Sequence, residues 1–256
     1  MQYEPARLLT GATDGIGLAL ARRWDARGIA CFFHGRRSFA DPAAGLDTTL
    51  FHERNYVEAD LARPDGPQAV ARKLAERGVE RLELLVLNAG VGWFGAPAHQ
   101  ASAATRAVVE VDLLAPMRLV HLLLPLLERA RGRIAFISSI AALLPSPRFA
   151  VYAAAKAAAE GFFRSLRVEL EDRVDVQVIR PGAVRTQMHA KSGASPEEIG
   201  WERFPSPEDV AQRIDRLLEG PPVWRTLGAA NRALGSLGRN LPRVVERLQA
   251  RREGGG

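Results

Sequence analysis

A chain of 256 residues that is 47% hydrophobic and carries a formal net charge of +6 can bury one large core, so we expect a single domain. The longest apolar run, residues 122–127, is too short to cross a membrane, and the five scattered histidines form no ligand pattern, so we expect a cytoplasmic protein without a metal site. The single cysteine excludes an internal disulfide. Most of the positive charge lies in the tail from Arg225 onward, and no nucleic-acid partner is expected.

Short apolar runs alternate with longer helical stretches, which is the pattern of a parallel sheet with crossover helices. Strands are predicted at residues 6–9, 29–34, 56–59, 84–87, 133–138, 174–179 and 223–227. Helices are predicted between them, at 16–27, 68–77, 101–129, 149–171 and 208–218. Residues 38–54 and 187–205 lack a clear period and predict an irregular crossover and a mobile loop, and residues 254–256 predict disorder. The pattern indicates an α/β fold with a doubly wound, Rossmann-type parallel sheet of about seven strands, with a catalytic domain at 1–228 and a tail at 229–256.

The first predicted strand runs into a glycine-rich turn that opens a helix. Glycines at this place let a dinucleotide pyrophosphate approach backbone amides at a helix N-terminus. A glycine-rich turn alone would equally be an ordinary tight turn, but the strand before it and the helix after it favour cofactor binding. The predicted cofactor-binding residues of this turn are Gly11, Thr13, Asp14, Gly15, Ile16 and Gly17.

The spacing TGxxxGxG of this turn differs from the GxGxxG of most Rossmann enzymes and resembles the short-chain dehydrogenase/reductase family. That family also carries Asn-Ala-Gly after its fourth strand, and here Asn88, Ala89 and Gly90 follow the predicted strand 84–87. The resemblance further implies that Asp60, with Leu61, contacts the adenine side of the cofactor. A helix N-cap is the alternative role for Asp60.

Cofactor choice is predicted from the residues after the second strand, His34, Gly35, Arg36 and Arg37. An acidic side chain here would hold an unmodified ribose, whereas an arginine pairs with a 2′-phosphate. The missing acid at Gly35 and the adjacent Arg36 resemble NADP-preferring members of the family, so NADP(H) is expected and NAD(H) is the alternative. Two observations oppose this: an Arg pair can arise by chance among 35 Lys and Arg residues, and Asp14 stands where many NADP-preferring relatives are basic.

Tyr152 and Lys156 are four residues apart on a predicted helix, so both side chains lie on one face. A neighbouring ammonium favours the phenolate and lowers the pKa of a tyrosine from its ordinary value near 10. Ser139 lies thirteen residues before Tyr152, the interval that the family shows, and the resemblance implies that Ser139 orients the carbonyl oxygen. Ser138 is the rival, but neighbouring residues of a strand point to opposite faces, so only one serine is expected to face the cofactor.

Two further segments resemble the family. Pro181, Gly182, Val184 and Thr186 match its PGxxxT segment, which implies contacts to the nicotinamide amide through the Val184 backbone and the Thr186 hydroxyl. Asp112 stands where the family has an asparagine whose backbone carbonyl completes a proton relay. This departure leaves open whether the four-residue relay operates. It does not change the expected activity.

The resemblance implies an NAD(P)-dependent oxidoreductase that interconverts a carbonyl and a secondary alcohol, in which Tyr152 donates the proton, Ser139 polarises the oxygen and Lys156 also holds the ribose. Mainly apolar residues are expected to edge the substrate pocket, which favours NADPH-dependent reduction of a lipophilic ketone or aldehyde. These residues, which could also be core or subunit-interface residues, are Trp93, Phe94, Leu143, Leu144, Phe149, Met188, Trp201 and Phe204. The alternative function is a catalytically silent NADP(H)-binding regulatory or scaffold protein.

The tail after residue 228 has a hydrophobic and a basic periodicity. Hydrophobic residues recur every three or four positions, at Leu234, Leu237, Leu241, Val244, Val245 and Leu248. Arginines recur on another face, at Arg232, Arg239, Arg243, Arg247 and Arg251. A basic amphipathic helix predicts peripheral attachment to an anionic membrane. Packing on a partner subunit of a homo-oligomer or on its own domain is the alternative, and Gly235, Gly238 and Pro242 weaken a continuous helix.

Overall fold

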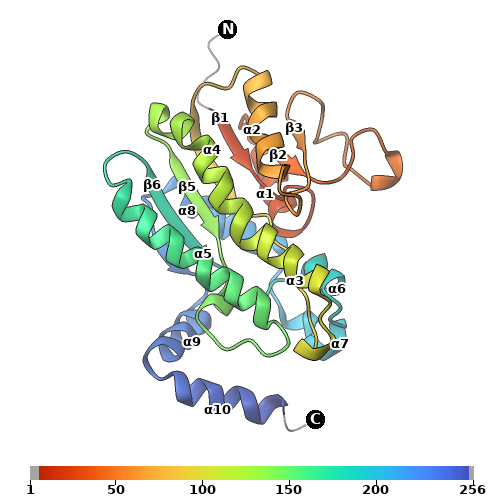
Figure 1. Ribbon diagram of the computed structural model, residues 1–256, viewed down its shortest axis with the longest axis vertical. Coiled ribbons are helices and arrows are strands. Elements are labelled where there is room, and N and C mark those ends of the chain that lie inside the picture. Colours follow the sequence, from red (N-terminus) through yellow and green to blue (C-terminus); the bar gives the residue numbers. More distant parts are fainter. Residues whose placement is uncertain (1–5, 254–256) are drawn as a thin grey trace.

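The computed structural model describes residues 6–253 and contains one sheet of seven parallel strands (Figure 1). The sheet order is β3-β2-β1-β4-β5-β6-β7, so the chain moves outward from β1 in one direction and then from β4 in the other. The carboxyl ends of β1 and β4 therefore flank the topological switch point where open α/β sheets bind ligands. The strands are β1 (Ala6–Leu9), β2 (Phe32–Gly35), β3 (Tyr56–Glu58), β4 (Leu82–Leu87), β5 (Arg133–Ile137), β6 (Asp175–Arg180) and β7 (Trp224–Thr226).

Helices cover both faces of this sheet, which confirms the predicted doubly wound α/β fold. In Figure 1, α2 (Gly66–Glu76), α4 (Ala115–Ala130) and α5 (Ala150–Glu169) lie in front of the strands, and α1 (Gly15–Asp25) and α8 (Pro207–Glu219) lie behind them. Each layer has its own hydrophobic core, and the central strands contribute to both because neighbouring residues point to opposite faces.

The predicted helix at 101–129 exists but is not regular. It consists of α3 (Ser102–Val109), a π-helical turn over Glu110–Leu114 and then α4. A π-helical turn inserts an extra residue and frequently marks a functional site. Here the inserted turn contains Asp112, which is completely buried.

Two predictions about local structure were wrong. Residues 29–31 are not strand, because the N–H of Ile29 still bonds to the C=O of Trp24 and completes the end of α1. Residues 187–205 are not a single irregular loop, since they form α6 (Gln187–Lys191), α7 (Pro196–Ile199) and a 3₁₀ turn at Trp201–Arg203. These helices are too short to give a readable hydrophobic period. The irregular crossover predicted at 38–54 is confirmed, with one 3₁₀ turn at Pro42–Ala44.

The tail forms two helices, α9 (Ala229–Asn240) and α10 (Pro242–Glu253), instead of one. The break falls at Pro242, which cannot donate the backbone bond that would continue α9. Both helices lie at the end of the molecule opposite the N-terminus (Figure 1). The disorder predicted at 254–256 lies outside the described residues. Within residues 6–253, none of the helices has the length and apolar character needed to span a bilayer.

Candidate active site

The glycine turn after β1 is packed against the start of the loop after β4. A Cβ at Gly17 would lie 2.0 Å from the carbonyl oxygen of Gly11, and a Cβ at Gly11 would lie 2.7 Å from Cα of Ala89. The Asn88 side-chain amide donates to the backbone oxygens of Thr10 and Gly11, both at 3.1 Å. The structure thus brings together two of the predicted motifs, and its close contacts require the glycines.

His34 lies beside the glycine turn, and the sequence predicted no role for it. Its Nε2 donates to the C=O of Ala59 at 3.1 Å, which leaves Nδ1 to accept from the N–H of Gly11 at 3.3 Å. Burial lowers the pKa of His34 to about 4, so the ring is neutral at physiological pH. A lone histidine in a strand carries no sequence signal of this kind. Asp60 is not a helix N-cap, because α2 begins after Asp65; the Asp60 side chain accepts from the N–H of Ala62 at 3.0 Å within the turn before that helix.

The end of β2 leaves no space for an acidic side chain. A Cβ at Gly35 would lie 2.5 Å from Cγ2 of Thr13 and 2.6 Å from the hydroxyl of Tyr56. Tyr56 is itself fixed, because its hydroxyl donates to the C=O of Arg37 at 2.8 Å. Arg37 donates to the C=O of Gly45 at 2.7 Å, whereas Arg36 is exposed and has no polar partner among the described residues.

The predicted catalytic residues meet at the carboxyl end of β5 and the first turns of α5. Ser139 accepts from the N–H of Ala141 at 3.1 Å, and its hydroxyl acts to lower the pKa of Tyr152. The ammonium of Lys156 lies 5.7 Å from the centre of the Tyr152 ring. Burial raises the pKa of Tyr152, and the Asp112 carboxylate adds to this rise, whereas Lys156 and Ser139 act to lower it. The net rise keeps Tyr152 protonated at neutral pH, the form that can donate a proton.

Asp112 forms a buried ion pair with Lys156. Its Oδ1 lies 2.9 Å from the lysine Nζ, with 0% and 3% of the two side chains exposed, and its Oδ2 accepts from the N–H of Val91 at 3.0 Å. A Cβ at Gly90 would lie 2.9 Å from Oδ1, so the last glycine of the Asn-Ala-Gly segment makes room for this pair. Burial acts to lower the pKa of Lys156, but Asp112 and Tyr152 outweigh it and leave that pKa raised. Burial raises the pKa of Asp112.

Glu160 and Arg180 form a second buried ion pair, which was not predicted from the sequence. Arg180 donates from Nε and Nη2 to the two oxygens of Glu160, at 2.7 and 2.6 Å, and Ser138 donates to Glu160 at 2.6 Å. Ser138 is therefore engaged by Glu160, two helical turns from Tyr152 on the same helix. One signal was available: Glu160 follows Lys156 by four residues and so lies on the same face of the helix.

The segment after β6 lies across from the glycine turn. The C=O of Pro181 accepts from the N–H of Ile140 at 2.9 Å, which joins this segment to the loop after Ser139. Thr186 packs on the turn, since a Cβ at Gly15 would lie 2.9 Å from its Cγ2. Val184 is buried. The two predicted cofactor segments are thus brought together in the structure.

Aromatic rings extend outward from Tyr152. The ring centre of Phe149 lies 6.2 Å from that of Tyr152, 5.0 Å from that of Phe94 and 6.1 Å from that of His189. His189, which is half-buried and has its pKa lowered by burial, also contacts Phe204 at 5.7 Å and was missed by the sequence reading. Trp201, predicted for the substrate pocket, instead lines a hollow of about 190 Å³ beside Asp14 and Thr186 on the cofactor side.

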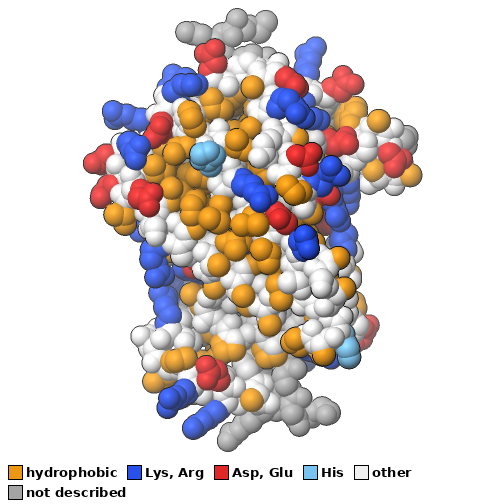
Figure 2. Space-filling view, in the orientation of Figure 1, with side chains coloured by type: hydrophobic (Ala, Val, Ile, Leu, Met, Phe, Trp, Pro, Cys, Tyr) orange, Lys and Arg blue, Asp and Glu red, His pale blue; other side chains and the backbone are white. Residues whose placement is uncertain are grey.

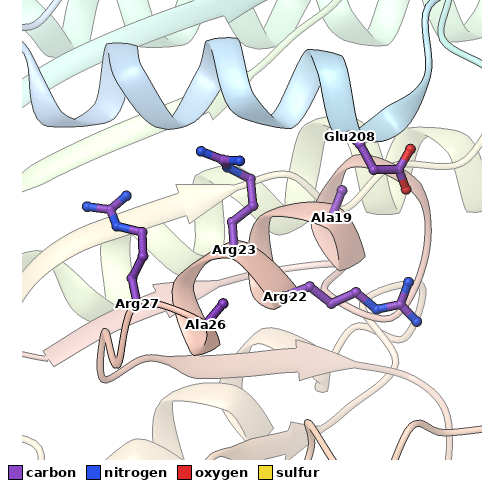
Figure 3. Close-up of a pocket in the computed structure, with 6 residues that line it drawn as sticks. All are labelled: Ala19, Arg22, Arg23, Ala26, Arg27 and Glu208. Atoms are coloured by element: carbon purple, nitrogen blue, oxygen red, sulfur yellow. The ribbon is translucent and has the colours of Figure 1, made fainter.

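A larger hollow of about 380 Å³ lies between α1 and α8, and none of the predicted catalytic residues lines it (Figure 3). Its walls are Ala19, Arg22, Arg23, Ala26, Arg27 and Glu208. Two of the arginines are already paired with the buried Asp215, Arg23 at 3.2 Å and Arg27 at 2.9 Å. Arg23 and Arg27 therefore join the α1 segment to α8. Among the described residues, His, Cys, Asp and Glu form no group of three that could hold a metal.

Comparison with known sequences gives relatives of one kind. The family model described as short chain dehydrogenase matches residues 6–197. "Dehydrogenase/reductase SDR family member 7B" of Rattus norvegicus is 33% identical over 192 residues, which cover 71% of this chain and 58% of the rat protein. This chain thus spans little more than half of that relative's length. "Nodulation protein G" of Rhizobium sp. (strain N33) is 33% identical over 201 residues, which cover 78% of this chain and 81% of that protein.

Comparison with solved structures gives the same kind of protein. A short chain dehydrogenase from Burkholderia cenocepacia in complex with NADP has a TM-score of 0.76 and 25% identity, covering 97% of this chain and 99% of that one. A short chain dehydrogenase/reductase from Burkholderia phymatum in complex with NAD has a TM-score of 0.75 and 21% identity, covering 91% and 92%. At that identity the second likeness concerns the fold alone.

Proposed function

Because this chain belongs to the short-chain dehydrogenase/reductase family, we propose that it is an NADPH-dependent enzyme that reduces a lipophilic ketone or aldehyde to an alcohol. The observation that carries the proposal is the geometry of three side chains. Tyr152 lies one helical turn from Lys156, and Ser139, whose hydroxyl acts on the pKa of Tyr152, follows β5 at the sheet edge that also holds the glycine turn. NAD(H) remains the alternative cofactor, since solved relatives are complexed with either nucleotide.

The proposed division of roles follows from what each side chain can donate. A bound nicotinamide supplies the hydride that adds to the carbonyl carbon. Tyr152 gives its phenolic proton to the carbonyl oxygen, and the Ser139 hydroxyl holds that oxygen in place. Lys156 has three N–H donors, of which one faces Asp112 and one the C=O of Ile137 at 3.3 Å, so one is left for the cofactor ribose.

The cofactor cradle would use the segments that meet at the switch point. In the glycine turn the N–H groups of Gly11 and Gly15 are bonded within the protein, so the remaining amides at the start of α1 would face a pyrophosphate. The residues proposed to hold the cofactor in addition to Tyr152 and Lys156 are Gly11, Thr13, Asp14, Gly15, Ile16, Gly17, Arg36, Arg37, Asp60, Leu61, Asn88, Ala89, Gly90, Pro181, Gly182, Val184 and Thr186.

The proposed substrate class rests on the aromatic side chains that extend from Tyr152. Phe94, Phe149 and Phe204 with His189 offer an apolar wall with few polar groups to orient a small hydrophilic substrate. Turnover is tested by following NADPH absorbance with a series of carbonyl compounds of increasing hydrophobicity. We expect kcat/KM to rise with hydrophobicity. Tight NADPH binding without turnover of any compound would instead favour a regulatory or scaffold protein.

Cofactor preference is expected to depend on Arg36. A charge-assisted hydrogen bond to a 2′-phosphate contributes about 1.5–3 kcal/mol, so Arg36→Ala should weaken NADPH binding more than tenfold. NADH lacks the phosphate and should bind as before. Fluorescence titration of both nucleotides gives the two dissociation constants, and Arg63→Ala, at another exposed arginine, is the control. An equal loss for both nucleotides would remove the phosphate role.

The Asp112 carboxylate is expected to set the pH range of reduction. Asp112 raises the pKa of Tyr152, so Asp112→Asn should lower that pKa. Reduction needs protonated Tyr152, and its rate falls as the pH rises through this pKa. The alkaline limb of the kcat/KM profile for reduction should therefore move to lower pH in Asp112→Asn, while the rate near neutral pH changes only a few-fold. An alkaline limb at the wild-type position would contradict the proposed influence of Asp112 on Tyr152.

We further propose a homo-oligomer in the cytoplasm. Figure 2 shows hydrophobic side chains gathered over α4 and α5, and α5 exposes Val168 by 72%. Ala154, Ala158 and Gly161 are exposed on the same side of α5, and small residues let a partner helix approach closely. Light scattering should give a multiple of 27.9 kDa for the wild type and a smaller species for Ala158→Arg. A wild-type mass of one chain would contradict the oligomer.

The proposed division of the chain assigns catalysis to residues 1–228 and peripheral attachment to the tail at 229–256. Support comes from the matched family region, which ends before the tail, and from the separate helices α9 and α10.

A further inference from the structure

Helices α9 and α10 expose a hydrophobic surface. Of the five large hydrophobic side chains exposed among the described residues, four lie here, with exposed fractions of 44–53%. They are Leu234, Leu241, Val244 and Leu248. Val245, by contrast, is buried, so α10 has one packed side and one uncovered side.

Arginines border this surface. In α10, Val244 and Leu248 are four residues apart and share a side, and Arg243 and Arg247 form the adjacent row at the same spacing. Arg232 and Arg239 are exposed on α9. None of the four arginine side chains has an ion pair or hydrogen bond with another described residue. Figure 2 shows basic and hydrophobic side chains together at this end of the molecule.

The opposite side of α9 contacts the loop that follows Ser139. A Cβ at Gly235 would lie 3.0 Å from Cδ1 of Leu143, and a Cβ at Gly238 would lie 2.6 Å from the carbonyl oxygen of Leu143. Leu143 follows Ser139 by four residues. Asn231 of the same helix packs on Gly182 of the proposed nicotinamide segment, where a Cβ would lie 2.3 Å from its Nδ2. One helix thus touches both the loop after Ser139 and the turn after β6.

We propose that α9 and α10 dock on an anionic lipid surface, and that docking accelerates carbonyl reduction through the contacts of α9 with the loop after Ser139 and with Gly182. This inference rests on the proposed function. Exposed aliphatic side chains bordered by unpaired arginines fit the boundary between acyl chains and anionic headgroups. A second copy of the same surface is a poor occupant, because an isologous contact would bring the two sets of arginines together.

The test uses the full chain with vesicles of phosphatidylcholine, alone or mixed with phosphatidylserine. Co-sedimentation measures binding, and NADPH oxidation with a water-soluble carbonyl measures turnover. We expect binding and a several-fold rise in turnover only with phosphatidylserine, both lost at high salt. Each arginine removed should lower binding roughly fivefold, so Arg243→Ala with Arg247→Ala should lose binding and stimulation while keeping basal turnover. Arg213→Ala with Arg216→Ala removes the same charge from exposed sites of α8 and should retain both.

A further variant separates docking from its effect on the site. Gly238→Ala adds a Cβ only 2.6 Å from the Leu143 carbonyl oxygen and should displace the loop, so this variant should bind vesicles without stimulation. Absence of salt-sensitive binding by the full chain would overturn the docking, as would binding to polyglutamate but not to vesicles, which would indicate an acidic protein. Binding without stimulation of the wild type would overturn the coupling. If neither the wild type nor any variant oxidised NADPH while vesicle binding was intact, the result would count against the proposed function only.

Discussion

Tyr152→Phe is expected to lower kcat by roughly 10²–10⁴-fold, the range attributed to general acid catalysis, while the NADPH dissociation constant stays nearly unchanged. The substitution removes the hydroxyl that is proposed to donate the proton, but keeps the ring, whose centre lies 6.2 Å from that of Phe149. Stopped-flow oxidation of NADPH gives kcat, and fluorescence titration gives cofactor binding.

Lys156→Ala is the matched comparison. It removes the ammonium that is proposed to hold the ribose and leaves Asp112 buried without its partner, so both kcat and cofactor binding should weaken. If Tyr152→Phe kept a tenth of the wild-type rate, another group would have to be the proton donor.

Glu160→Leu is expected to reduce the free energy of unfolding by about 3–5 kcal/mol, the usual cost of removing one partner from a buried ion pair. Glu160 receives two hydrogen bonds from Arg180 and one from Ser138, and the exposed fractions of the Glu160 and Arg180 side chains are 5% and 4%. Without the carboxylate, the guanidinium stays buried without an anionic partner, 5.5 Å from the centre of the Trp224 ring. Urea unfolding followed by circular dichroism measures the loss.

The double variant Glu160→Leu with Arg180→Met tests the cause. Replacing both charges by apolar groups of similar size removes the stranded cation, so most of the lost stability should return. A loss below about 1 kcal/mol for Glu160→Leu alone, which is the usual worth of an exposed pair, would mean that water reaches Arg180.

The fold and the main site motifs could be predicted because their signals are local. The glycine turn and the Tyr152–Lys156 pair are short spacings within one element or at one junction, and the order of strands and helices follows from hydrophobic periodicity. Each of these signals depends on neighbours within a few residues. The structure therefore adds the contacts of these motifs and leaves their positions as predicted.

The partners that come from distant parts of the chain could not be predicted in the same way. Arg180 reaches Glu160 across the β6–α5 contact, and His34 bonds to the turn after β1 and to the end of β3. Tertiary packing decides such pairs, and a single arginine or histidine in a strand gives no pattern. The hydrophobic period of the tail was visible, but the uncovered side of α10 depends on what the rest of the chain covers.

The packing around Gly35 has a consequence for redesign of cofactor use. A single substitution of Gly35 by Asp or Glu is the direct route to an enzyme that uses NADH, yet the new Cβ would overlap Thr13 and the Tyr56 hydroxyl. Moving Tyr56 would also release the Arg37 backbone that it holds. A switch to NADH therefore requires smaller side chains at positions 13 and 56 before the acid is introduced. In an evolving lineage, this order of steps would make the proposed preference for NADPH hard to reverse by one mutation at a time.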